Sequence, residues 1–420
     1  DELTGLPNRF YIQELISEMI ANKQRGERLA LAFVDLDEFK RVNDLYGHVT
    51  GDALLREVAQ RLQSAIRASD VAGRISGDEF VIALDPVEDY TDTSAIIDRL
   101  QNSLQQSLDF NGTQLTPSAS IGIAVYPSHG ADYETLRRHA DIAMYRAKLT
   151  TKGSISFFTR DLGREADERL MLEKSLHDAI SSRGFHCALQ KKVDIRSGAV
   201  TGFEILARWV DREGKVRSPG EFLPLASELG LLDDITMCVL DDLIKRLPEL
   251  DISFGPGTEY SLNISPAQTT NVPFMTELTR KLEDQNSQRF FLELTEEALS
   301  AMDILEREVL PMLRAANIRL SIDDFGTGYS SLSKLAALTV DELKVDMSLM
   351  TAIHDRPRNQ VILRAIESLG SALGISIVAE GIESTAENDF LLSNTAITIG
   401  QGFLFHKPQL LDEMLGTAVA

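Results

Sequence analysis

The sequence "RISGDEFVIAL" at residues 74–84 decides the fold of the first part of the chain. Apolar residues flank a polar tip made of Ser76, Gly77, Asp78 and Glu79. Gly tolerates a positive φ and Asp can bond its own backbone, so the tip predicts a β-hairpin turn. Turn chemistry does not explain two adjacent carboxylates that lead directly into a strand apolar enough to be buried. The tip is therefore either an ordinary turn or part of a metal site.

A second strand that ends in a carboxylate precedes this hairpin. It is the apolar run LALAFVD at residues 29–35, which ends in Asp35. If it pairs with the hairpin, Asp35, Asp78 and Glu79 meet at one sheet edge, as in polymerase palms that bind two metals with a nucleoside triphosphate. On the pattern alone, a strand end and a turn are an equally good interpretation.

Helical and strand patterns alternate through the rest of the first part. A helical apolar stripe covers residues 51–67. After the hairpin the pattern predicts a helix near 92–108, a long strand near 115–126, a helix near 133–149 and a short strand near 154–158. A mixed sheet with helices indicates an α+β domain of the ferredoxin or polymerase-palm type, residues 1–160. The polar stretch 161–184 predicts a semi-rigid helical linker.

From residue 185 to residue 420 the pattern changes to strands that are mostly separated by helical stretches. About eight strands over some 235 residues is the size of one (β/α)8 TIM-like barrel. A doubly wound open sheet is the alternative. The predicted strands are HCALQKKVDI, VTGFEILARW, EYSLNIS, RFFLELT, RLSIDDF, DELKVD, ISIVAE and ITIGQGF.

Polar side chains stand late in, or just after, successive predicted strands of this second part. One such Asp is usually a helix N-cap or a turn residue, but six strands that each carry one are hard to explain by capping. Barrel enzymes keep their chemistry at this rim, and oxygen ligands from several strands favour Mg²⁺ or Mn²⁺ over zinc. Two ions bridged by adjacent carboxylates predict phosphodiester hydrolysis. The residues are Glu204, Asn263, Glu293, Asp323, Asp324, Lys344 and Glu380.

Composition excludes several classes of protein. The chain has 42 Lys and Arg against 64 Asp and Glu, and the net charge of −22 argues against binding to a nucleic-acid polymer. A small phosphate ligand remains compatible if metal ions neutralise nearby carboxylates. The two cysteines, Cys187 and Cys238, lie in no metal-binding pattern, and no signal peptide or membrane segment is evident. We therefore expect a cytoplasmic chain, with an upstream sensor or membrane anchor left open.

The second part resembles an EAL-type cyclic-di-GMP phosphodiesterase over about residues 165–410. The resemblance implies a TIM-like barrel that cleaves cyclic-di-GMP with two Mg²⁺ or Mn²⁺ ions. The matching motifs, in chain order, are GFEILARW, FLPLASELGLL, SLNISPAQ, LELTEE, IDDFGTGYSSL, LKVD, VAEGIE and QGFLFHKP.

Roles for individual residues follow from this resemblance. It implies that one ion is held by Glu204, Asn263, Glu293 and Asp323, and the second by Asp323 and Asp324. Lys344 would contact the water nucleophile, and Glu380 would act as general base or support the metal site. The resemblance also implies a metal-site position for Glu383 and substrate contacts for Gln190, Arg208 and Gln401.

Three positions depart from the EAL pattern. Ile205 enlarges the middle residue of the Glu-Ala-Leu signature, Lys191 replaces a usual Pro, and Thr398 replaces a common Asp before the Gln-Gly pair. None of these changes removes a predicted metal ligand, so we expect the phosphodiesterase to be active. A receptor that binds cyclic-di-GMP without cleaving it is the alternative.

The first part resembles a GGDEF diguanylate cyclase domain through DELTGLPNR, FVDLDEFKRVNDLYGHVTGD, RISGDEF and ADIAMYRAK. The resemblance implies that Asp35 and Asp78 coordinate Mg²⁺ and that Glu79 acts at the same site. Each domain would hold one GTP, so cyclase activity implies a homodimer. Guanine would be read by Asn43 and Asp52, and the triphosphate would meet Lys148 and Lys152, the latter at a position where the family often has Arg.

Two further features qualify this resemblance. Arg67 and Asp70 form the RxxD of the family's product-inhibition site, and Arg74 would complete a clamp on cyclic-di-GMP. A surface loop with a salt bridge is the plainer interpretation. Ser76 replaces the first Gly of the signature, and if that position needs a positive φ, Ser would cost about 1 kcal/mol.

The sequence therefore predicts a bifunctional enzyme that makes cyclic-di-GMP from two GTP and hydrolyses it to linear pGpG. The first alternative keeps the phosphodiesterase and makes the SGDEF domain a GTP-binding regulator. The second alternative is a non-catalytic cyclic-di-GMP receptor.

Overall fold

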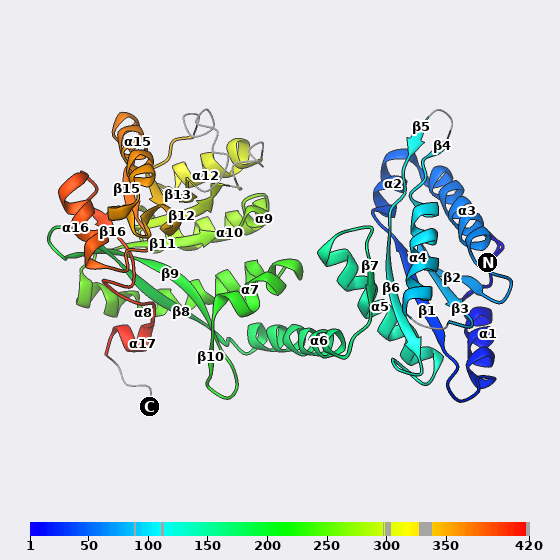
Figure 1. Cartoon of the computed structure of the whole chain (residues 1–420). Helices are drawn as coiled ribbons and strands as arrows, with labels where there is room; N and C mark the ends of the chain where they lie inside the picture. Colours follow the sequence, from blue (N-terminus) through cyan, green and yellow to red (C-terminus); the bar gives the residue numbers. More distant parts are fainter. Residues whose placement is uncertain (88–89, 111–112, 297, 299–303, 327–337, 417–420) are drawn as a thin grey trace. The chain divides into compact units, whose positions relative to one another are not determined.

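The computed structural model of the chain is shown in Figure 1. Two compact units are present, Asp1–Met171 and Leu172–Ala420, and each is described by itself. The predicted linker coincides largely with helix α6 (Arg160–Ser181), and the domain limits drawn from the sequence stay a prediction. No helix among the described residues combines the length and the apolar character that a membrane crossing needs. The structure describes all residues except 88–89, 111–112, 297, 299–303, 327–337 and 417–420.

A five-stranded sheet with the strand order β2-β3-β1-β6-β7 is the centre of the first unit. Strand β1 is antiparallel to both of its neighbours, β3 and β6. The elements are α1 (Arg9–Ala21), β1 (Leu29–Leu36), α2 (Phe39–Tyr46), α3 (His48–Ala65), β2 (Val71–Ser76), β3 (Glu79–Leu84), α4 (Tyr90–Leu104), β4 (Leu108–Phe110), β5 (Thr113–Leu115), β6 (Ala119–Tyr126), α5 (Tyr133–Thr150) and β7 (Ile155–Phe157).

Both faces of this sheet are covered by helices. Successive side chains of a strand point to opposite faces, so the apolar strands present an apolar surface on each side of the sheet. Ala32 and Val34 of β1 belong to one apolar cluster with residues of α3 and α4. Leu31 and Phe33 belong to the opposite cluster, with residues of α1 and α5. The palm-like α+β fold predicted from the sequence is confirmed.

Two predicted elements of the first unit differ in their bounds. Helix α4 ends at Leu104 and not near residue 108, and the short pair β4–β5 follows it. The strand predicted near 115–126 joins the main sheet only from Ala119, as β6. Pro117 explains the delay, because proline has no N–H to donate to a central ladder.

The second unit is a closed barrel of eight strands. The sheet order runs β9-β11-β12-β13-β14-β15-β16-β8, and the pairing of β8 with β9 closes it. The TIM-like barrel is therefore confirmed, and the open doubly wound sheet is wrong. Its strands are β8 (Phe185–Asp194), β9 (Val200–Val210), β11 (Glu259–Ile264), β12 (Phe290–Thr295), β13 (Arg319–Phe325), β14 (Glu342–Val345), β15 (Ser376–Ala379) and β16 (Ile399–Gly400), with β10 (Val216–Arg217) and β17 (Gln409–Leu410) added at β9 and β8.

Helices follow most of these strands. The longest, α8, packs against β8 and β9, and α15 packs against β15. The helices of this unit are α7 (Pro219–Glu228), α8 (Leu232–Phe254), α9 (Pro266–Thr269), α10 (Val272–Glu283), α12 (Leu310–Ala315), α14 (Met347–Met350), α15 (Pro357–Leu373), α16 (Thr385–Asn394) and α17 (Leu411–Met414), with a π-helical turn at Leu305–Val309 and short 3₁₀ turns at Ser287–Arg289 and Ile353–Asp355.

One strand departs from the regular (β/α)8 pattern, since β8 is antiparallel to both β9 and β16. Only residues 195–199 connect β8 to β9. A parallel crossover needs a dozen or more residues. This connection is too short for one, so β8 and β9 form an antiparallel hairpin. Asp194 stabilises the turn, because its Oδ1 accepts hydrogen bonds from the backbone N–H groups of Arg196 and Ser197.

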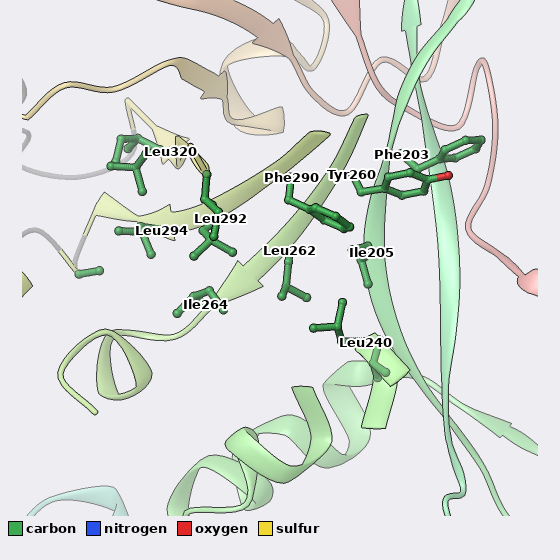
Figure 2. Packing of buried hydrophobic residues seen from close by; sticks show 14 of the residues in the cluster. Phe203, Ile205, Leu240, Tyr260, Leu262, Ile264, Phe290, Leu292, Leu294 and Leu320 are labelled. Carbon is green, nitrogen blue, oxygen red and sulfur yellow. The ribbon is translucent and has the colours of Figure 1, made fainter. Parts of the chain in front are cut away.

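Alternate residues of the barrel strands separate apolar from polar side chains. Figure 2 shows Phe203, Ile205, Tyr260, Leu262 and Leu292 in the apolar cluster that also holds Leu240 of α8. The intervening positions, Glu204, Ser261 and Glu293, point to the barrel interior instead, as the two-residue period requires. The polar residues that the sequence places on successive strands therefore share one interior.

Gly122 on β6 lies where the backbone of α5 comes close to the first sheet. A Cβ atom at this position would lie 2.0 Å from the carbonyl oxygen of Ala140 and 2.1 Å from the backbone nitrogen of Met144, both on α5. Only a residue without a side chain allows this contact between backbones.

We predict that Gly122→Ala destabilises the first unit by at least about 1–3 kcal/mol, because the added methyl group forces α5 away from the sheet. Far-UV circular dichroism during heating measures this loss. Trp209 is the only tryptophan in the sequence and lies buried in the second unit, so its fluorescence transition serves as an internal control that stays unchanged. An unchanged first transition would contradict the packing argument.

Candidate functional site

Lys344 of β14 lies at the centre of the barrel site, with 1% of its side chain exposed. Its Nζ is 2.7 Å from Glu293 Oε2 and 2.7 Å from Glu380 Oε1. The same atom is 3.1 Å from Asp323 Oδ1 and 3.8 Å from Glu204 Oε2. Carboxylates carried by β9, β12 and β13, and by the residue that follows β15, therefore converge on one ammonium group.

These carboxylates outnumber the cations beside them, and their pKa values show the imbalance. Burial raises the pKa of Glu380 to about 8 against the opposing effect of Lys344, and nearby Asp323 and Glu204 add to the rise. Burial likewise raises the pKa of Glu204. For Glu293 burial also acts upward, but Lys344 and Lys192 outweigh it and lower the pKa to about 2. The site thus holds more negative charge than Lys344 alone can compensate.

Asp323 and Asp324 bring a second group of oxygens to the rim. Ligand oxygens of Asp323, Asp324 and Glu380 lie within 4.8 Å of one another. Asp324 has a φ of +55°, in the left-handed region that costs a non-glycine residue about 1 kcal/mol. Its backbone N–H donates to Asp323 Oδ1 at 3.0 Å. Strain of this kind is typical of functional positions, and here it turns two consecutive carboxylates toward one place.

Amide side chains complete the rim beside Glu204. Asn263 donates from Nδ2 to Glu204 Oε1 at 2.7 Å, and Gln401 donates from Nε2 to Glu204 Oε2 at 2.5 Å. Gln401 Nε2 also lies 3.1 Å from Gln190 Oε1, and Gln190 donates to the carbonyl of His406. The side-chain amide oxygen of Gln401, Oε1, is buried and has no hydrogen-bond partner among the described residues.

This donor set fits Mg²⁺ or Mn²⁺. Among the described residues the available ligand atoms are oxygens, the carboxylates exceed the cations, and the amide oxygen Oε1 of Gln401 has no partner. Residues that would hold an ion are Glu204, Asn263, Glu293, Asp323 and Asp324.

Two predicted site residues make no described hydrogen bond to this cluster, although Arg208 interacts electrostatically with Glu204. Glu383 is exposed and is not part of the described cluster of Asp323, Asp324 and Glu380; its backbone N–H donates to Glu387. Arg208, on β9, is half-buried, and its guanidinium donates to the carbonyl of Ala207. In the loop FGTGYSS that follows Asp324, Phe325 ends β13 and Gly326 has a φ of +103°, whereas residues 327–331 lie outside the described part of the chain.

A largely apolar cavity of about 550 Å³ adjoins the rim. Leu206 and Asn263 line it from the barrel, and Leu223 and Thr236 line it from α7 and α8. It lies beside the carboxylate of Glu204, because Asn263 contacts both.

The first unit holds a second carboxylate cluster at the edge predicted from the sequence. Asp35 on β1 lies opposite Glu79 on β3 in the antiparallel register, and Asp78 precedes Glu79 in the hairpin. Lys148 of α5 places its Nζ 2.6 Å from Asp35 Oδ1. Burial raises the pKa values of both Asp35 and Asp78, and the neighbouring carboxylates add to the rise. The pairing that makes these carboxylates neighbours is confirmed.

The two Asp residues of the DxD at the end of β1 play different parts. Asp37 accepts hydrogen bonds from the hydroxyl groups of Ser118 and Ser120, so it holds the neighbouring strand. Asp35 points to the carboxylate cluster.

Ser76 is the last residue of β2 and does not have a positive φ, whereas Gly77 has a φ of +47°. The strain considered for a serine at this position therefore does not arise. Its hydroxyl group donates to Glu79 Oε2 at 2.6 Å. The substitution acts through this hydrogen bond and not through the backbone.

The remaining predicted residues of the first unit lie around this edge. Asn43 sits against Gly51, where a Cβ atom would come within 2.0 Å of Asn43 Oδ1, and Gly51 directly precedes Asp52. Lys152 pairs with Glu38 at 3.0 Å and not with Asp35.

In the RxxD, Asp70 is buried and its carboxylate accepts from the backbone N–H groups of Arg67 and Asp85. Arg74 donates to the carbonyl of Gly77 and pairs with Asp1. In this arrangement Asp70 stabilises the turn before β2.

Sequence reasoning missed one acidic neighbour in the first unit and two charges in the second. Asp141 of α5 is half-buried, burial raises its pKa, and Glu79 contributes to the rise. Its spacing of seven residues from Lys148 places both on one helix face, which was an available signal. In the barrel, Lys192 and Glu342 contact each other at 2.8 Å in the interior.

Comparison with known proteins gives the class of the chain. It belongs to the family described as "EAL domain", which it matches over residues 173–408. Residues 1–154 match "Diguanylate cyclase, GGDEF domain", so the chain is a tandem GGDEF–EAL protein.

Two named relatives share nearly the whole of this chain. It is 35% identical to "Cyclic di-GMP phosphodiesterase PdeR" of Escherichia coli over 97% of this chain and 61% of that protein. It is 34% identical to "Bifunctional diguanylate cyclase/cyclic di-GMP phosphodiesterase MucR" of Pseudomonas aeruginosa over 99% of this chain and 61% of that protein. The chain thus spans less than two thirds of the length of either relative.

Solved structures agree with the fold. "PaMucR Phosphodiesterase, c-di-GMP complex" has a TM-score of 0.53 and 32% identity over 58% of this chain and 99% of that one. "Vibrio cholerae LapD S helix-GGDEF-EAL (bound to c-di-GMP)" covers 97% of this chain and 96% of its own, with a TM-score of 0.51 and 20% identity, and shows the shared fold.

The raised pKa of Glu380 predicts a pH dependence of stability in the presence of a chelator. Because the folded pKa is about 8 and the ordinary value is 4.5, the folded chain holds the extra proton between these values. The stabilisation from this group is fully present below about pH 4.5 and is lost as the pH rises through 8. The loss should be on the order of a few kcal/mol.

Urea unfolding followed by Trp209 fluorescence, at intervals from pH 5 to pH 8.5, measures the effect. Glu380→Gln should flatten the pH profile relative to the unaltered chain. Parallel profiles for the two proteins would contradict the assignment.

Proposed function

We propose that the chain is a bifunctional cyclic-di-GMP enzyme. The barrel hydrolyses cyclic-di-GMP to linear pGpG with two Mg²⁺ or Mn²⁺ ions, and the first unit makes cyclic-di-GMP from two GTP. The observation that carries the proposal is the ring of carboxylates around Lys344, which come from β9, β12 and β13 and from the residue after β15. PdeR is named as a cyclic di-GMP phosphodiesterase, and MucR is named as bifunctional, with both activities.

In the barrel, the carboxylates and Asn263 hold the ions and the lysine orders them. When bound, the divalent ions polarise the scissile phosphate and lower the pKa of the attacking water. Glu380 accepts the proton that this water loses, and Lys344 keeps Glu380 and Glu293 in place through its two 2.7 Å contacts. Attack at phosphorus breaks one P–O bond and opens the ring, and the released ribose oxygen takes up a proton.

The dinucleotide is held by the polar rim beside the ions. Gln190 and Gln401 are hydrogen-bonded to each other, and the side-chain Oε1 of Gln401, which has no partner among the described residues, is available to a ligand. Arg208 supplies a positive charge for phosphate or for a guanine edge. The adjoining apolar cavity is large enough for a purine base.

In the first unit, Asp35 and Asp78 hold Mg²⁺ with one GTP and Glu79 acts beside them. Lys148 lies 2.6 Å from Asp35 and carries the charge that meets the triphosphate. Asn43 and Asp52 read the guanine. The 3′-hydroxyl of one GTP attacks the α-phosphate of the other and pyrophosphate leaves, so synthesis needs two first units facing each other as a homodimer.

One observation supports a second candidate, in which the first unit only binds GTP and regulates the phosphodiesterase. The hydroxyl of Ser76 occupies Glu79 Oε2 at 2.6 Å. That oxygen is then less available to a metal ion, which weakens the case for synthesis more than the case for GTP binding.

Glu204→Gln tests the phosphodiesterase. The amide keeps the size of the side chain but removes a charged metal ligand, so kcat/KM for cyclic-di-GMP should fall by at least about a hundredfold. Chromatography of cyclic-di-GMP and pGpG after incubation with Mn²⁺ measures this rate. Glu413→Gln, at an exposed position of α17, is the matched control and should keep full activity. Undiminished cleavage by the Glu204 variant would refute the assignment of the site.

Ser76→Gly tests the cyclase in chains that also carry Glu204→Gln, so that the product survives. Loss of the hydroxyl frees Glu79, and the rate of cyclic-di-GMP synthesis from GTP should rise several-fold, because a hydrogen bond to a charged group is worth roughly 1.5 kcal/mol. Asp78→Asn should abolish synthesis. If neither the parent chain nor the Ser76 variant makes cyclic-di-GMP while both bind GTP, the regulator is the correct function.

A further inference from the structure

Lys192 is a buried charge that the proposed chemistry leaves unused. It lies on β8 with 3% of its surface exposed, deep in the barrel. Its Nζ donates to Ser261 Oγ at 2.6 Å, to Glu342 Oε1 at 2.8 Å and to Glu293 Oε1 at 3.0 Å. These partners belong to β11, β14 and β12, so one side chain connects four strands across the interior.

The ammonium group is fully satisfied by these partners. A lysine has three N–H donors, and each is directed to one acceptor. Glu342 is held in turn by the hydroxyl of Ser321 at 3.0 Å. A satisfied buried network of this kind has one geometry, because any rotation of the lysine leaves a charge without a partner.

Glu293 is the member of this network that also belongs to the candidate metal site. Its Oε1 accepts from Lys192 and its Oε2 accepts from Lys344 at 2.7 Å. The two lysines approach different oxygens of the same carboxylate. The plane of the carboxylate is therefore fixed, with Oε1 toward the barrel interior and Oε2 toward the rim where Glu204, Asp323 and Glu380 converge.

We propose that Lys192 is a positioning residue for metal binding: it anchors Oε1 of Glu293 so that Oε2 is presented to a divalent cation. This inference rests on the proposed function of the barrel site. Groups that orient the ligands of a metal typically change metal affinity by 10–100-fold when they are removed.

The two roles that Lys192 can have, as a charge or as an anchor, predict opposite changes in cation affinity when the lysine is removed. Removal of a positive charge close to a cation site strengthens cation binding if Lys192 acts only through its charge. Removal of an anchor weakens cation binding, because Glu293 is then free to rotate. Metal affinity therefore separates the two roles, and a purely structural role would change the stability of the fold without this loss of affinity.

The test compares Glu342→Met with the double variant Lys192→Met and Glu342→Met. Deleting Lys192 alone would leave Glu342 as a buried charge without its partner, whereas replacing both charges by unbranched apolar side chains avoids that penalty. Every chain also carries Asp78→Asn, so that Mn²⁺ bound by the first unit does not contribute. Trp209 fluorescence confirms that each chain is folded before the titration.

Binding of Mn²⁺ to the full chain is measured by the loss of the free-ion signal in electron paramagnetic resonance. We expect the double variant to bind Mn²⁺ about 10–100-fold more weakly than the Glu342→Met chain. Equal or tighter binding by the double variant overturns the positioning role and leaves the proposed function intact. If the Asp78→Asn chain with Lys192 and Glu342 unchanged binds no Mn²⁺ that Glu204→Gln removes, the proposed function fails, and the positioning role fails with it.

Discussion

The barrel site depends on one buried ammonium group. An isolated charge in the interior of a protein is costly, and Lys344, 1% exposed, is stable only because carboxylates from several strand ends surround it. The reverse also holds, since Glu204, Glu293, Asp323 and Glu380 would repel one another without a cation between them. Lys344 holds the ring together, and the excess of carboxylates leaves a place for divalent ions.

Much of the fold could be predicted because its determinants are local. The two-residue alternation in the barrel strands separates Phe203 and Ile205 from Glu204, and the printed sequence shows that pattern directly. The antiparallel first strand could also have been predicted, because residues 195–199 are too few for a crossover helix. The late start of β6 follows from Pro117. What the alternation cannot give is the closure of the sheet, which depends on the pairing of β8 with both β9 and β16.

Site residues at strand ends could be predicted for the same reason, and those that act across the interior could not. Asp35 and Glu79 are adjacent because their strands pair, so the apolar runs that carry them were sufficient. Lys192 and Glu342 are 150 positions apart, and the residues around each of them do not indicate that the two side chains are in contact. The sequence predicts that Ser76 acts through backbone strain, whereas in the structure its hydroxyl group donates a hydrogen bond to the side chain of Glu79. A hydrogen bond between two side chains, such as this one, can be identified only from the three-dimensional structure.

In the function proposed for the barrel, the ring of carboxylates around Lys344 directs water to a phosphodiester. The most direct measurement incubates the chain with cyclic-di-GMP and Mn²⁺ in ¹⁸O-labelled water and determines the mass of the product. We expect linear pGpG with one solvent oxygen in its terminal phosphate, and no product when a chelator is present. Product without the label, or equal product in chelator, would contradict it.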